Sequence, residues 1–191
     1  QHDVTSAILS WLNSGTLPEP INHTLITLIP KIANPEHVSE FRPISLCNVL
    51  YKIFSKVLAN RLKIFLPLLI TEHQSAFAKE RLISDNIMVA FETLHHMKQH
   101  NSGKHGFMAI KLDMSKAYDR VEWVYLERLL EKMGFCDRWV ALMMSCVKSV
   151  SHSIMVNGEP TGMIHPKRGI RQGDSLSPFL FLLCTEGLHA L

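Results

Sequence analysis

One segment of the chain has the residue types and spacing that phosphoryl-transfer chemistry requires. Residues Ala109–Asp119 begin as an alternating apolar run, deliver a carboxylate at Asp113, and continue into a tight turn. Mg²⁺ needs hard oxygen ligands on a rigid element, and a carboxylate at a strand end meets that need, although such an aspartate also suits a turn cap. Ser115 stands where a phosphatase-type aspartate pair needs its second carboxylate, which argues against that chemistry. Asp119 is better suited to cap a helix than to bind a metal.

A second segment, Arg168–Pro178, has a composition that suits binding of a phosphorylated ligand. Its two glycines allow a close approach of the backbone, and Arg168 and Arg171 can bind phosphates. Gln172 can form hydrogen bonds to a base or a sugar. The alternative interpretation is a polar turn that precedes a helix starting at Ser-Pro.

The elements that must position these segments are mixed in type. Phe107–Asp113 is the clearest strand, with Ala109, Lys111 and Asp113 on one face. Asp119–Glu122 is typical of a capping box that opens a helix, and Gly134 suits its end. The remaining elements are helices over 4–12, 48–66, 84–96, 137–149 and 179–191, a strand over 23–29, a hairpin over 152–167, and polar loops over 30–43 and 169–178. This pattern predicts an α+β fold.

The helix expected to begin after Asn48 carries most of a local basic stretch. Residues 41–71 contain five Lys or Arg and no acid, which suits either a nucleic-acid footprint or a solvated helix face. Three lysines share one side of this helix, and six apolar residues share the opposite side. Arg61 falls on the apolar side, so we expect it either to extend to solvent or to meet a buried anion. The lysines are Lys52, Lys56 and Lys63, and the apolar side is Leu50, Ile53, Phe54, Val57, Leu58 and Phe65.

Composition places the chain among globular proteins of about one domain. It has 191 residues, 47% of them hydrophobic and 19% charged, with a net charge of +3. These values exclude a disordered tail, a collagen or a coiled coil. Four widely spaced cysteines argue against zinc or a disulfide framework. No apolar run is long enough for a membrane span, and no secretory signal is apparent, so we expect an intracellular protein, nuclear or cytoplasmic. The absence of an initial Met indicates a piece of a longer chain.

Six short motifs in one order carry a resemblance to a known family. The chain resembles reverse transcriptases of non-LTR (LINE-type) retrotransposons, most closely the plant members, over essentially its whole length. The motifs are Leu28–Lys31, Phe41–Leu46, Asn60–Leu62, His73–Phe77, Lys111–Trp123 and Arg168–Pro178. The resemblance implies a right-hand polymerase, with a fingers-like region over 1–105 and a partial palm over 106–191.

The resemblance also implies roles for residues near the first segment. Asp113 would be the first catalytic carboxylate and would bridge two Mg²⁺ ions. The main-chain carbonyl of Met114 would help to hold the metal of the nucleotide. Tyr118 would lie under the incoming sugar and exclude a 2′-OH, which selects dNTPs. An RNA template and a DNA primer would be the partners of the complete enzyme, and no membrane is implied.

Other residues acquire roles in binding the nucleotide and the template. Lys31 and Arg42 would hold the triphosphate, with surface charge as the alternative. Gln172 and Gly173 would line the templating pair and the dNTP. The nucleic-acid contacts would come from Lys52, Lys56, Lys63 and Arg61, although the lysines are also compatible with a solvated stripe and Arg61 with an internal ion pair.

The chain departs from the family pattern at three points. It has no Asp-Asp pair, which the family uses to complete its metal site, and one carboxylate cannot hold two Mg²⁺ ions. Glu80 stands where the family often has Gly, and Ser175 replaces a frequent Pro. We therefore expect a truncated fingers and palm that is inactive alone. The alternatives are an inert retrotransposon remnant and a nucleic-acid-binding module without catalysis.

Overall fold

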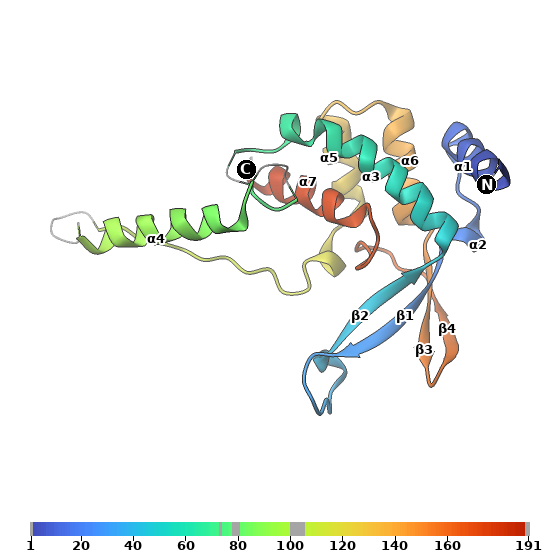
Figure 1. Ribbon diagram of the computed structural model, residues 1–191, viewed down its shortest axis with the longest axis horizontal. Coiled ribbons are helices and arrows are strands. Elements are labelled where there is room, and N and C mark those ends of the chain that lie inside the picture. Colours follow the sequence, from blue (N-terminus) through green and yellow to red (C-terminus); the bar gives the residue numbers. More distant parts are fainter. Residues whose placement is uncertain (1, 73, 78–80, 100–105, 190–191) are drawn as a thin grey trace.

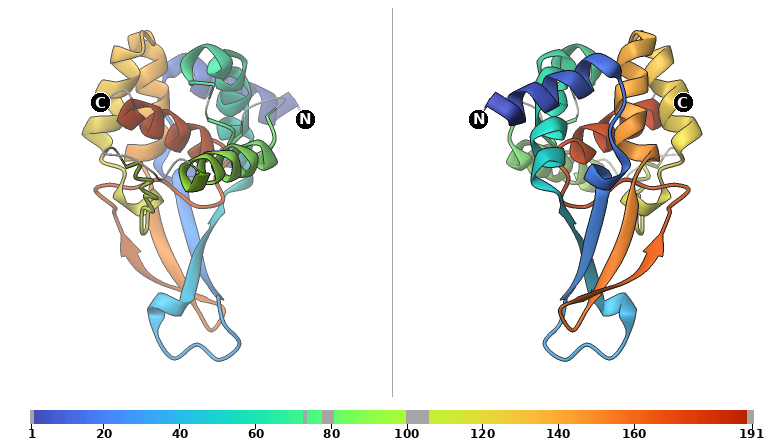
Figure 2. Two further views of the ribbon diagram at one scale, coloured as in Figure 1. Left: turned by 90° about the vertical axis from the view of Figure 1, so that its left-hand side faces the viewer. Right: turned by 90° about the vertical axis from the view of Figure 1, so that its right-hand side faces the viewer.

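The computed structural model describes residues 2–72, 74–77, 81–99 and 106–189. A body of helices lies above a four-stranded sheet, and one helix projects sideways from the body (Figure 1). The projecting helix is α4 (Ile83–Gln99). The sheet is twisted and lies below the helices (Figure 2). Within the described residues, no helix combines the length and hydrophobicity needed to cross a membrane.

The sheet is mixed and has the order β2-β1-β3-β4. Strands β1 (His23–Pro30) and β2 (Phe41–Cys47) are antiparallel, with Ile29 opposite Arg42. Strand β3 (Ser151–Val156) runs parallel to β1 and antiparallel to β4 (Glu159–Ile164). The Asn157-Gly158 turn joins β3 and β4 with both φ angles positive, as the hairpin prediction requires. The sheet takes two strands from each side of the boundary proposed at residue 105, so that division stays a prediction.

Strand β2 begins inside the segment expected to be a polar loop. That loop was predicted to reach Pro43, but a short helical turn, η1 (Val38–Glu40), leads directly into β2 at Phe41. Pro43 has no N–H to donate, and β2 is an edge strand, where a missing donor is tolerated. The proline therefore indicated an edge strand rather than a loop.

The longest helix, α3 (Val49–Leu69), starts where the sequence predicts. The side chain of Asn48 accepts a hydrogen bond from the Leu50 N–H at 2.9 Å. Its buried face is rotated from the expected one, because Ile53 and Phe65 are exposed. Helix α3 packs on α1 (His2–Ser14) and α7 (Ser177–His189). Its buried residues are Tyr51, Phe54, Ser55, Leu58, Ala59, Leu62 and Leu66.

The other helices complete one hydrophobic core. Helices α5 (Trp123–Lys132) and α6 (Asp137–Lys148) pack on each other, and a short helix, α2 (Glu19–Asn22), leads into β1. Gly134, with φ of 84°, ends the segment after α5 as expected. The predicted capping box is wrong, because residues 118–120 form a short helical turn, η2 (Tyr118–Arg120), and α5 starts three residues later without a side-chain cap.

Candidate functional site

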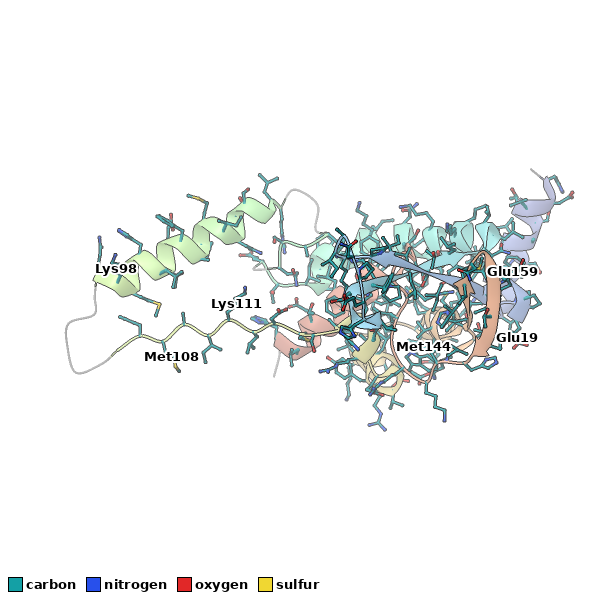
Figure 3. The ribbon with its side chains drawn as sticks, turned by 90° about the horizontal axis from the view of Figure 1, so that it is seen from below. Glu19, Lys98, Met108, Lys111, Met144 and Glu159 are labelled. Atoms are coloured by element: carbon teal, nitrogen blue, oxygen red, sulfur yellow. The ribbon has the colours of Figure 1, made fainter. Side chains whose placement is uncertain are left out.

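The segment that carries Asp113 is extended but forms no strand. Residues 106–114 have no ladder partner among the described residues, and they run back beside α4 toward the body (Figure 3). Phe107, Met108, Ile110 and Leu112 are 60–84% exposed. The strand prediction for 107–113 is therefore wrong as to pairing, because a strand exists only where a neighbour accepts and donates its backbone hydrogen bonds. The face of α4 that was expected to be apolar is likewise exposed at Ile87, Phe91 and Leu94.

The turn after Asp113 is tight and leads to an aromatic stack. Lys116 has a φ of 53°, a left-handed conformation that is costly for a residue with a side chain. Its carbonyl accepts the Asp119 N–H at 3.0 Å, which closes the turn. Tyr118 then stacks on Phe181 of α7 with ring centroids 5.0 Å apart. Burial raises the pKa of the Tyr118 hydroxyl above its usual value. The ring is thus held flat against the helical body.

A hollow of about 440 Å³ lies beside Asp113, between the 113–122 segment and helices α5 and α7. Asp113 and the Met114 carbonyl are the oxygen donors expected for a metal. Among the described residues, no group of three or more His, Cys, Asp or Glu side chains could hold a metal ion. Whether Asp113 and the Met114 carbonyl hold a metal in the complete protein stays a prediction.

The loop that carries Gln172 and Gly173 lies directly on strand β2. The Ser45 N–H donates to the Gln172 carbonyl at 3.0 Å, outside the β2–β1 ladder. Gly173 has a φ of 99°, and a Cβ there would come within 3.2 Å of the Ser45 carbonyl oxygen. The two residues expected to line a nucleotide site are therefore joined to the strand that carries Arg42.

Replacing Gly173 with alanine should destabilise the fold by about 2 kcal/mol, because the new Cβ meets both an unfavourable φ and the Ser45 carbonyl. Gly158→Ala is the matched control, since its φ is 87° but a Cβ there would have no atom within 4 Å. We expect urea unfolding to show the larger loss for Gly173→Ala. Equal losses would mean that the contact with β2 contributes nothing.

The two arginines of this loop differ in environment. Arg168 is exposed and pairs with Glu122 at 3.3 Å. Arg171 is 7% exposed, and its guanidinium contacts Asn22, Thr24 and the carbonyl of Cys146. The prediction that both arginines can bind phosphates is wrong for Arg171, because protein acceptors already surround its buried donors.

Lys31 and Arg42 lie near the same end of the β1–β2 hairpin. Lys31 follows Pro30, and its ammonium donates to the Ser39 carbonyl at 2.8 Å. Arg42, opposite Ile29, is exposed and has no partner among the described residues. Ser45 lies three positions after Arg42, roughly 10 Å along a strand. Arg42 is therefore free to bind a ligand, whereas Lys31 must first release Ser39.

The cations of α3 fall into two separate groups. Lys52, Lys56 and Lys63 are exposed and share one side of the helix. Arg61 is exposed on the opposite side, where it lines an apolar hollow of about 460 Å³ with Phe65 and other residues of α3, the α5–α6 connection and α6. It forms no ion pair among the described residues. Of the two alternatives left open for Arg61, the structure shows the exposed side chain rather than the buried ion pair.

Two contributors to the site were absent from the sequence-based prediction. Phe181 supports Tyr118, and its only sequence signal was the apolar run of the last helix. Trp123 ends one of the six motifs but had no role in the site assigned to it, and its indole N–H donates to the Gly169 carbonyl at 2.8 Å. Glu80 lies outside the described residues.

Residues 29–190 match the protein family described as reverse transcriptase (RNA-dependent DNA polymerase). The match covers well over half of the chain and includes Arg42, Asp113, Tyr118 and Gln172. The chain belongs to the reverse transcriptase family. Membership confirms the predicted family and its fingers-and-palm type of fold, whereas the roles of individual residues remain predictions.

The reverse transcriptase relatives come from mobile elements. The chain is 30% identical over 184 residues to the transposon TX1 uncharacterized 149 kDa protein of Xenopus laevis. The aligned region covers 96% of this chain and 14% of that protein. It is 28% identical over 178 residues to the retrovirus-related Pol polyprotein from type-1 retrotransposable element R2 of Popillia japonica, covering 90% and 24%. The chain therefore spans a quarter or less of the length of these curated relatives.

These relatives support a reverse transcriptase of non-LTR elements, as the motifs predicted. The expected plant affinity is not confirmed. An uncharacterized mitochondrial protein of Arabidopsis thaliana, AtMg01250, is 60% identical, but only over 37 residues, or 19% of this chain. The matches that cover 90% or more of the chain include proteins of a frog and a beetle.

Proposed function

We propose that this chain is the nucleotide- and template-binding part of an RNA-directed DNA polymerase. In the complete protein it would help to add dNTPs to a DNA primer along an RNA template. The observation that carries the proposal is the reverse transcriptase match over residues 29–190. Two geometric facts support it. The Gln172-Gly173 loop is hydrogen-bonded to the strand of Arg42, and the Tyr118 ring is stacked on Phe181 near the Asp113 segment.

Each role follows from the chemistry of the side chain and its surroundings. The guanidinium of Arg42, exposed and without a partner among the described residues, suits a triphosphate, and Lys31 is the weaker candidate because Ser39 already binds it. The ring of Tyr118 would exclude a 2′-OH by steric clash, supported by Phe181. Gln172 and Gly173 would line the templating pair.

The proposed Mg²⁺ site would need ligands in addition to Asp113 and Met114. Asp113 and the Met114 carbonyl would contribute to the site, and further carboxylates would have to complete it. We therefore expect no primer extension by the 191-residue chain on poly(rA)/oligo(dT) with Mg²⁺. Extension that Asp113→Ala abolishes would show that the chain completes its own site. An in-frame Ala-Asp-Asp box in the coding sequence past Leu191 would favour the polymerase over an inert remnant.

RNA binding by α3 is the test that this chain permits directly. A salt titration of single-stranded RNA binding should give a steep log–log slope, because Lys52, Lys56 and Lys63 would displace counterions from phosphates. Replacing all three with Gln should reduce that slope by about 2. The matched control replaces Lys98, Lys132 and Lys167, which lie on three different parts of the chain. No measurable binding at low salt would favour an inert remnant, and equal losses in both variants would exclude a specific role for α3.

A further inference from the structure

We infer that Arg171 is a positioning residue that holds the Tyr118 turn and strand β2 in one fixed relation. The inference rests on the proposed function, because it concerns the residues proposed to contact the sugar and the triphosphate. The loop 169–173 lies between these two parts, and Arg171 is its one side chain that is bonded into the protein interior on several sides. Its task would be to make Tyr118 and Arg42 act on the same nucleotide.

The guanidinium of Arg171 joins elements that are far apart in the sequence. Nη1 donates to Asn22 Oδ1 at 2.7 Å and to Thr24 Oγ1 at 3.0 Å, at the junction of α2 and β1. Nη2 donates to the Cys146 carbonyl of α6 at 3.1 Å. Asn22 donates in turn to the same carbonyl at 3.1 Å, which completes a closed network. All of these side chains are buried.

Two further groups neutralise and support the buried charge. Asp174 lies 3.6 Å from Nη2 and accepts the Tyr51 hydroxyl at 2.7 Å. The guanidinium carbon lies 4.0 Å above the centre of the Tyr51 ring, within the range of a cation–π contact. Asp174 also accepts the Leu176 N–H at 3.3 Å, which fixes the loop just before α7.

The backbone on either side of Arg171 holds the two proposed contact regions. On one side, the Gly169 N–H donates to the Val121 carbonyl at 2.7 Å, and the Ile170 N–H donates to the Tyr118 carbonyl at 2.9 Å. On the other side, Gln172 accepts the Ser45 N–H. A shift of Arg171 would therefore change the position of the Tyr118 turn relative to β2.

Lysine cannot replace arginine here without loss, although it keeps the positive charge. The planar guanidinium reaches three acceptors at once and stacks on Tyr51, whereas an ammonium is a compact charge on a flexible stem. Arg171→Lys is therefore the informative variant. It leaves Asp174 with a cationic partner but removes the planar group that reaches three acceptors and stacks on Tyr51.

The functional test measures nucleotide binding by the full chain, using a fluorescently labelled dTTP with Mg²⁺. We expect Arg171→Lys to weaken binding about tenfold and to reduce the preference for dTTP over labelled UTP. The control is Ile8→Ala, a buried substitution in α1 that lowers stability away from the loop. Both variants are measured at temperatures where they remain folded. If Arg171→Lys binds like the wild type, or if the control loses the same preference, Arg171 has no positioning role.

Hydrogen exchange tests the coupling without any ligand. In Arg171→Lys, the amides of Ser45, Gly169 and Ile170 should exchange about tenfold faster as a group. The reason is that each of their hydrogen bonds has either its donor or its acceptor on the displaced loop. Ile8→Ala should leave that group protected relative to α3. Unchanged or unequal exchange would overturn the inference. Absence of nucleotide binding by the wild-type chain would instead count against the proposed function, and the exchange rates would still decide whether Arg171 couples the two regions.

Discussion

Asp113→Ala is expected to lower nucleotide incorporation by about three orders of magnitude or more in a polypeptide that extends this chain through an Ala-Asp-Asp sequence. The proposed role of Asp113 is to hold Mg²⁺, and a metal stabilises transition-state charge by several kcal/mol, with each 1.36 kcal/mol worth a factor of ten. Primer extension on poly(rA)/oligo(dT) measures the effect. The affinity for RNA should be unchanged, because Asp113 is exposed and remote in sequence from the lysines of α3.

Asp119→Asn is the matched control for this substitution. Asp119 is an exposed carboxylate in the same turn, and its predicted capping role is not realised. We expect activity within about threefold of the wild type, as for a surface change worth about 0.5 kcal/mol. Equal activity of Asp113→Ala and the wild type would exclude Asp113 from the metal site. Equal losses in both variants would mean that the turn, rather than the Asp113 carboxylate, is what matters.

Asp174→Ala should destabilise the isolated chain by about 3–5 kcal/mol, the usual cost of removing one partner of a buried ion pair. Both side chains of the Arg171–Asp174 pair are 5% exposed, so the guanidinium would remain buried without its counter-charge. The Tyr51 hydroxyl would also lose its acceptor. Urea unfolding measures the loss, and the midpoint should fall without a change in slope.

Asp3→Ala provides the comparison for Asp174→Ala. Asp3 is an exposed aspartate in the first turn of α1, where its charge is worth a few tenths of a kcal/mol to about 1 kcal/mol. A loss below about 1 kcal/mol for Asp174→Ala would show that the remaining hydrogen bonds of Arg171 are sufficient. In that case the network would be a weak constraint on the loop.

Local patterns were enough to predict most elements of this fold. The Asn48 cap, the Asn157-Gly158 hairpin and the stop at Gly134 depend on side chains and φ preferences that act within a few residues. The order of six motifs was enough to predict the family, which the match over residues 29–190 confirms. Such features are readable because their causes lie in the same stretch of sequence as their effects.

Strand pairing and helix orientation could not be read in this way. Residues 107–113 alternate like a strand, but the described residues provide no neighbour to pair with them. Apolar residues cover a broad arc of helix α3 outside its lysine side, so the elements packed on it decide that Tyr51 and Leu62 are buried and Phe65 is exposed. Both outcomes depend on what surrounds the element rather than on its own periodicity.

The sequence by itself determined the family and the candidates for chemistry: Asp113, Tyr118, Arg42 and the Gln172-Gly173 loop. Only the tertiary structure separated Arg168, which is exposed, from Arg171, which is buried with Asp174, Tyr51, Asn22 and Thr24. Two arginines three residues apart look alike in a sequence, because each can bind an anion. Their roles diverge when partners from distant parts of the chain meet one guanidinium and leave the other in solvent.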